Sequence, residues 1–200
     1  MLELTDRQLW LLDGALRLLD RAGIDGVTMR SLATEVNLSP MAAYKHFENQ
    51  RGLYVALWRT CMDRLRGGIL TIAQSGEPDS LLILTRIIRQ FLQFAREFPH
   101  RFELLFDHPV IQEIGTAWEI ESRRSELRDT ALGLLVAGQK TGQIRDDLSA
   151  QRLLSVVYAT VQGACNILVA DRLADFTTTT MDEAIETIVQ LTDESLRPRK

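Results

Sequence analysis

The chain has 200 residues, of which 46% are hydrophobic and 25% charged, and its formal net charge is −4. This composition is ordinary for a globular protein, and the negative balance argues against a chain-wide electrostatic hold on nucleic acid. No apolar run reaches the roughly 20 residues of a membrane helix, and no signal peptide is visible. Its two cysteines, Cys61 and Cys165, form no metal or redox motif. We therefore expect a cytoplasmic protein without a membrane partner.

The beginning of the chain predicts three short helices. Apolar residues recur at helical spacing over residues 5–21, which indicates a first amphipathic helix. Thr28 can cap a second helix that ends near Val36. Ser39 can cap a third helix, with Pro40 at its first position, where the missing N–H costs nothing.

The rest of the chain also has helical periodicity and no strand-like alternation, so we predict an all-α protein. Asn49 can cap a long fourth helix that contains Gly67 and Gly68. This glycine pair is typical of a close helix contact or an early helix end, and alternatively of a kink or hinge. Further helices are predicted over residues 80–98, 99–106, 115–141, 149–173 and 180–195.

Residues 28–47 have the spacing of a helix-turn-helix: a helix of about nine residues, a tight turn at Asn37 and Leu38, and a second short helix. Asparagine tolerates the left-handed backbone that such a turn requires. We therefore predict two domains. Residues 1–50 would form a helix-turn-helix DNA-binding domain, and residues 51–200 a larger helical domain for ligand binding and dimerisation.

The second helix of such a pair enters the major groove with its N-terminal residues at the base edges. In this geometry the start of the third helix reads bases, and its end reaches the flanking phosphates. The starts of the second and fourth helices add phosphate contacts. The residues that we predict to contact DNA are Thr28, Arg30, Ser39, Pro40, Met41, Ala42, Tyr44, Lys45, His46 and Arg51.

The stretches GIDGVTMRSLA (residues 23–33) and LSPMAAYKHF (residues 38–47) resemble the DNA-binding domain of the tetracycline-repressor (TetR/AcrR) family, and the likeness covers about residues 7–57. The resemblance implies phosphate contacts from Thr28, Tyr44 and His46. It also implies a variable helical effector domain whose last two helices pair in a homodimer. This chain has Asn37 where the family usually has Gly, and it lacks the family's usual Lys near Gln50.

Apolar residues beyond residue 51 suggest two further sites. Aromatic side chains with a few polar neighbours have the composition of a ligand pocket, although aromatics at helical spacing are also typical of a core. The predicted pocket residues are Phe94, Phe98, Phe102, Phe106, Trp118, Tyr158, Gln162 and Cys165. The predicted dimer interface consists of Leu154, Val161, Leu168, Ile185, Ile188 and Val189.

These patterns predict a homodimeric transcriptional regulator that binds operator DNA, acts as a repressor and is released by a small, largely apolar effector. No catalytic motif or set of metal ligands stands out, so we predict neither an enzyme nor a cofactor. Two alternatives stay open. One is a DNA-binding regulator without a small-molecule effector, and the other is a helical interaction module that no longer binds DNA.

Overall fold

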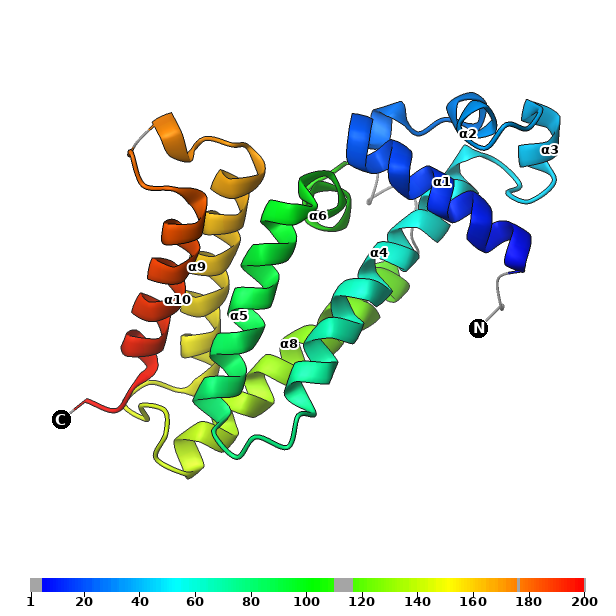
Figure 1. Ribbon diagram of the computed structural model, residues 1–200. Coiled ribbons are helices and arrows are strands. Elements are labelled where there is room, and N and C mark those ends of the chain that lie inside the picture. The colour runs from blue at the N-terminus through cyan, green and yellow to red at the C-terminus, as the bar shows by residue number, and fades with distance from the viewer. Residues whose placement is uncertain (1–4, 110–116, 176, 200) are drawn as a thin grey trace. The chain divides into compact units, whose positions relative to one another are not determined.

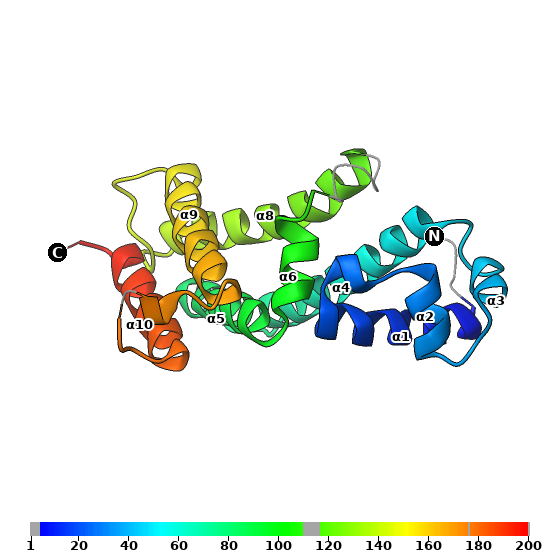
Figure 2. The same ribbon diagram turned by 90° about the horizontal axis from the view of Figure 1, so that it is seen from above.

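The computed structural model describes residues 5–109, 117–175 and 177–199, except for the side chains of Pro40, residues 117–121 and Ala174. Every regular element in these ranges is a helix, as predicted (Figures 1 and 2). The α-helices are α1 (Asp6–Ala22), α2 (Met29–Glu35), α3 (Pro40–Tyr44), α4 (Gln50–Ala73), α5 (Ser80–Glu97), α6 (Pro99–Phe106), α8 (Ala117–Lys140), α9 (Ala150–Val169) and α10 (Met181–Leu196). Short 3-10 helices are η1 (Ile24–Gly26) and η2 (Leu173–Asp175).

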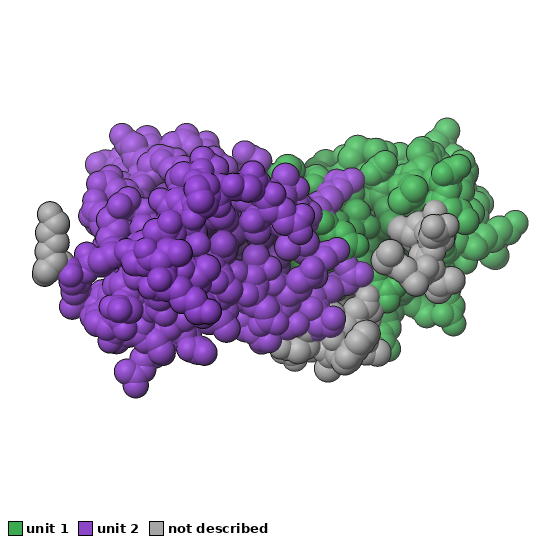
Figure 3. All heavy atoms as spheres, turned by 90° about the horizontal axis from the view of Figure 1, so that it is seen from below, with its two compact units in different colours: residues 1–63, 98–119 green, residues 64–97, 120–200 purple. Residues whose placement is uncertain are grey.

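The chain forms two compact units, coloured separately in Figure 3. The first unit consists of Met1–Asp63 and Phe98–Glu119, and the second of Arg64–Glu97 and Ile120–Lys200. This division differs from a single boundary at residue 50, because the first half of α4 and all of α6 belong to the first unit. Sequence position alone could not show that α6 packs against α1.

Helix α1 is the centre of the first unit, and α2 and α6 both pack against it. Its apolar stripe, which includes Leu11 and Leu19, is fully buried. At its C-terminal end, Asp20 accepts two hydrogen bonds from the guanidinium of Arg101 in α6, at 2.7 and 2.6 Å. The Arg101 side chain is only 11% exposed, so this bidentate pair fastens α6 to α1.

In the second unit, α5, α9 and α10 lie side by side (Figure 1). Their facing sides bury Ile87 and Leu84 of α5 together with apolar residues of the other two helices. On the solvent side, Arg89 pairs with Glu186 at 2.6 Å, and Arg96 pairs with Asp182. These ion pairs fix the register of α10 against α5.

Two details of the longer helices differ from the sequence predictions. Helix α4 continues through Gly67 and Gly68, so an early helix end there is wrong. A close contact is also absent, because a Cβ added at Gly67 would have no heavy atom within 4 Å and one at Gly68 would have only the tip of Gln90. The hinge stays a prediction. Helix α9 ends at Val169, earlier than predicted, and Asp171 follows with φ 51°.

Candidate nucleic-acid interface

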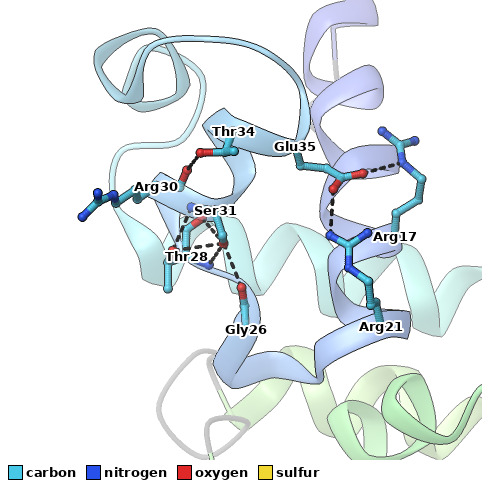
Figure 4. A network of polar contacts seen from close by, with 8 residues as sticks. All are labelled: Arg17, Arg21, Gly26, Thr28, Arg30, Ser31, Thr34 and Glu35. Carbon is cyan, nitrogen blue, oxygen red and sulfur yellow. Dashed lines mark hydrogen bonds and ion pairs between the residues drawn. The ribbon is translucent and has the colours of Figure 1, made fainter.

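The start of α2 is built by a network of short-range hydrogen bonds (Figure 4). The Thr28 hydroxyl accepts a hydrogen bond from the Ser31 N–H at 3.0 Å, and the Ser31 hydroxyl accepts one from the Thr28 N–H at 2.8 Å. Ser31 also donates to the Gly26 carbonyl at 2.8 Å. Thr28 is therefore the cap that the sequence predicts, and its own N–H is already bonded within the helix start.

The turn between α2 and α3 contains a left-handed residue and a backbone hydrogen bond. Asn37 has φ 53°, the left-handed conformation predicted for it, and the Leu38 N–H donates to the Ala33 carbonyl at 2.8 Å. The Ser39 hydroxyl then accepts from the Ala42 N–H at 3.3 Å and caps α3. The second helix of the motif thus begins at the position that the sequence predicts.

Helix α3 buries one side and presents the other to solvent. Ala43 is fully buried and Phe47, just after the helix, is almost so. The Gln8 side chain donates to the His46 carbonyl at 3.1 Å, which ties the end of this segment to α1. On the outer side, Met41 is 72% exposed and Tyr44 is 49% exposed. The start of the second helix of a helix-turn-helix is the part that meets base edges, and here it is exposed.

The start of α4 is held next to the start of α2. The Asn49 side chain accepts from the Gly52 N–H at 2.9 Å, as expected for the predicted cap. One turn later the Tyr54 hydroxyl donates to the carbonyl of Val27 at 3.0 Å. Val27 directly precedes Thr28. The Tyr54–Val27 hydrogen bond therefore joins the two helix starts that we predict to meet phosphates.

Two arginines of α1 are committed to an internal brace that the sequence did not reveal. Glu35 at the end of α2 accepts from Arg17 and from Arg21, each at 2.9 Å (Figure 4). Its hydrogen bonds with Arg21 and then Arg17 lower the pKa of the Glu35 carboxyl. Arg30, in the first turn of α2, points away from this brace, and its side chain has no ion pair within the described residues.

The structure therefore places most of the predicted DNA contacts on the surface of the first unit. Thr28, Ala42 and His46 are half-buried, and the side chain of Pro40 lies outside the described residues. The exposed members are Arg30, Ser39, Met41, Tyr44, Lys45 and Arg51.

The predicted pocket residues divide between the two units. Phe98 precedes α6 and Phe102 and Phe106 lie within it, all in the first unit, where the Phe102 and Phe106 ring centroids are 4.8 Å apart. In the second unit, Phe94 and Cys165 are buried and Gln162 is half-buried. Tyr158 is 59% exposed on α9, unlike the buried Phe94 and Cys165, and its place in a pocket stays a prediction. The side chain of Trp118 lies outside the described residues.

The residues predicted for the dimer interface need a similar correction. Val161, Leu168, Ile185 and Val189 are buried inside the second unit, where α9 and α10 pack with α5, and Leu154 and Ile188 are half-buried. Four of the six side chains therefore have too little surface left for a partner. The exposed large apolar side chains on these two helices are Val156, Tyr158, Ile167 and Leu191.

A braced helix-turn-helix with an exposed second helix defines a domain of the DNA-binding class. Residues 11–57 match the family described as "Bacterial regulatory proteins, tetR family". Residues 11–57 of this chain are therefore similar to the DNA-binding domain of this family.

Two curated relatives align with more of the chain. The biofilm operon icaADBC HTH-type negative transcriptional regulator IcaR of Staphylococcus aureus is 27% identical over 82 residues, which are 41% of this chain and 44% of IcaR. The chain thus aligns with less than half of the length of IcaR. The HTH-type transcriptional repressor KstR2 of Rhodococcus jostii is 26% identical over 149 residues, which are 72% of this chain and 71% of KstR2.

Solved structures share the fold along nearly the whole chain. A TetR/AcrR regulator from Thermobifida fusca has a TM-score of 0.75 at 16% identity, covering 96% of this chain and 100% of its own. AibR in complex with isovaleryl coenzyme A and operator DNA has a TM-score of 0.72 at 17% identity, with 93% and 97% covered. FadR from Bacillus subtilis in complex with stearoyl-CoA has a TM-score of 0.69 at 12% identity, with 94% and 99% covered. At such identities the likeness shows the fold.

Proposed function

We propose that this chain is a homodimeric, sequence-specific DNA-binding repressor that is released from its operator by a small, largely apolar effector. The exposed side of α3 is the observation that carries the proposal. Met41 and Tyr44 are exposed to solvent rather than packed in the core. In a helix-turn-helix this side of the second helix enters the major groove. Both curated relatives, IcaR and KstR2, are named as negative regulators of transcription.

Base reading at this surface relies on apolar contact. Met41 lies at the start of α3, where its side chain can meet the methyl group of a thymine. Ser39 keeps a hydroxyl that can still donate to a base edge while it caps the helix. Because the described part of α3 offers no arginine or asparagine for bidentate base contacts, DNA shape and paired half-sites contribute to specificity.

Phosphate contacts come from exposed cations around α3. Arg30, Lys45 and Arg51 have no ion pair within the described residues, whereas Arg17 and Arg21 of α1 both pair with Glu35. Arg17 and Arg21 hold α2 against α1 through Glu35. Arg30, Lys45 and Arg51 are available to DNA. These three cations would supply the local positive charge that DNA binding needs in a chain whose net charge is negative.

The outer face of α9 fits a second copy of this chain. Ser155, Ala159 and Gly163 follow one another at intervals of four residues and are all exposed, so a second helix could approach closely along them. Val156 and Ile167 flank this row of small residues. By length and composition alone α9 is also apolar enough to cross a membrane, and 28% of that apolar window is buried within the chain. A dimer would cover the remainder and pair two α3 helices on a two-fold operator.

Acyl-CoA thioesters are the effector class that we propose. AibR and FadR share this fold and have been solved with isovaleryl coenzyme A and stearoyl-CoA. Within the first unit, the aromatic rings of Phe102 and Phe106 in α6 offer the kind of apolar surface that an acyl chain requires. To act as an inducer, the ligand must bind the DNA-free conformer more tightly than the DNA-competent one.

The test is footprinting of the DNA upstream of the chain's own gene, followed by fluorescence-anisotropy titrations at several salt concentrations. We expect a protected two-fold site, an affinity that falls steeply with salt, and release by isovaleryl-CoA or stearoyl-CoA. Binding without any sequence preference would contradict the repressor. Specific binding that neither thioester weakens would contradict only the effector class.

A further inference from the structure

The indole N–H of Trp58 is a buried donor without an acceptor. Trp58 lies on α4 in the first unit and is 2% exposed, and its Nε1 has no hydrogen-bond partner within the described residues. An indole N–H can only donate, so only a hydrogen-bond acceptor can satisfy it. Buried polar atoms are almost always paired, because the lost contact with water is costly. An exception of this kind calls for a physical explanation.

Positions next to Trp58 on α4 are apolar and buried. Leu57 precedes it, and Cys61 and Met62 lie one turn further along α4; all three have essentially no exposed surface. The α4 face that carries Trp58 and Cys61 is therefore enclosed within the first unit rather than turned to solvent.

A cation of α6 near this face, Arg101, already has a carboxylate partner. The Arg101 guanidinium of α6 lies within electrostatic range of Cys61. It also lies 4.2 Å above the ring of Phe98 and donates two hydrogen bonds to Asp20. An anionic ligand group would have to compete with Asp20 for Arg101, and a hydrocarbon would leave the indole N–H unsatisfied. The complementary ligand group is an uncharged oxygen.

We propose that Trp58 donates its indole N–H to an uncharged carbonyl oxygen of the effector. This makes Trp58 a residue that selects ligands with a carbonyl inside an otherwise apolar group, such as the thioester carbonyl of an acyl-CoA. The inference rests on the proposed effector control. It adds the atom by which a carbonyl compound is distinguished from the corresponding hydrocarbon.

The test compares ligands that differ only in this oxygen. Isothermal titration calorimetry measures the binding of isovaleryl-CoA and stearoyl-CoA and of their thioether analogues, in which a CH₂ group replaces the carbonyl. We expect the wild-type chain to prefer each thioester about tenfold. Trp58→Phe should bind both members of a pair equally. Trp10→Phe is the matched control, because this tryptophan is partly exposed and stacks with Arg7, and it should keep the preference.

A second measurement does not depend on the folding of Trp58→Phe. In ¹⁵N spectra of the indole groups, the variants Trp10→Phe and Trp118→Phe identify the Trp58 resonance by elimination. We expect its proton to lie upfield without ligand, as for an unbonded N–H, and to move downfield with a thioester. If the thioesters bind but the resonance stays and Trp58→Phe keeps the preference, the role of Trp58 is wrong. If neither thioester binds, the effector class fails and this assignment with it.

Discussion

The helix-turn-helix of the first unit and the helix layer of the second unit both combine local and long-range contacts, but they expose different surfaces. In the first, bonds between residues a few positions apart, such as the Thr28–Ser31 box, set where each helix begins. In the second, contacts between distant residues, such as Arg89 and Glu186, position α5 and α10. The first unit exposes Met41 beside cations, whereas α9 exposes small and apolar residues without charges between them. The first surface suits DNA and the second suits a copy of the same chain.

Substitution of Gly163 by leucine breaks this comparison most strongly. A Cβ at Gly163 would have no heavy atom within 4 Å in the isolated chain, so Gly163→Leu should not disturb the subunit. In a dimer the same side chain would hold the two α9 helices apart. We expect sedimentation to show monomers and operator affinity to fall about a hundredfold or more, because a single α3 reads only a half-site.

The matched control for this experiment is Gly133→Leu. Gly133 lies in α8, is exposed, and likewise has no heavy atom within 4 Å of an added Cβ. It should leave both the dimer and operator binding unchanged. A dimer that survives Gly163→Leu, or one that both substitutions disrupt, would show that the small-residue face of α9 is not the interface.

The attachment of α6 to α1 gives the next largest effect. Asp20→Asn removes the carboxylate that neutralises the 11%-exposed Arg101 side chain, and we expect a loss of about 2 kcal/mol in the free energy of unfolding. Asp25→Asn is the control, because the Asp25 side chain is 97% exposed and 3.9 Å from His108. Urea denaturation measures both. Equal effects of the two substitutions would mean that the bidentate Arg101–Asp20 pair does not hold α6 against α1.

The Glu35 brace predicts a dependence of stability on pH. Because Arg21 and Arg17 lower its pKa below 4.5, the contribution of Glu35 is present above about pH 4.5 and is lost as pH falls through the folded-state value. The Tm of the wild-type chain should therefore fall more steeply below about pH 4.5 than the Tm of Glu35→Gln. Glu48→Gln, at an exposed site without an ion pair in the described structure, should follow the wild-type curve. Parallel curves for all three chains would exclude the brace.

The turn residue Asn37 gives the smallest effect. At φ 53°, a residue with an ordinary side chain is strained by about 1 kcal/mol or more, and glycine is not. We expect Asn37→Ala to lower the free energy of unfolding by about 1 kcal/mol and Asn37→Gly to leave it unchanged or slightly higher. Urea denaturation that ranks the alanine variant above the glycine variant would contradict the left-handed turn.

The same contrast explains what the sequence could predict. The caps at Thr28, Ser39 and Asn49 were recognisable because their hydrogen bonds join residues three positions apart. The brace on Glu35 was not, because its partners are 14 and 18 residues away on another helix.

The inward face of α9 was misassigned for a different reason. This helix is apolar on several sides, so periodicity could not distinguish the buried Val161 from the exposed Val156. The unpaired N–H of Trp58 is likewise invisible in a sequence, because satisfaction of a donor depends on the folded surroundings.

The exposed side of α3 is the central claim, and operator binding by two of its variants tests it most directly. The measurement is the affinity of wild-type, Met41→Ala and Tyr44→Ala chains for the footprinted operator and for every single-base variant of one half-site. We predict that Tyr44→Ala weakens binding to all sequences alike, whereas Met41→Ala changes the preference at one position, by about 1 kcal/mol or more. If both substitutions weaken every sequence by the same factor, or if neither has an effect, α3 does not read the operator in this way.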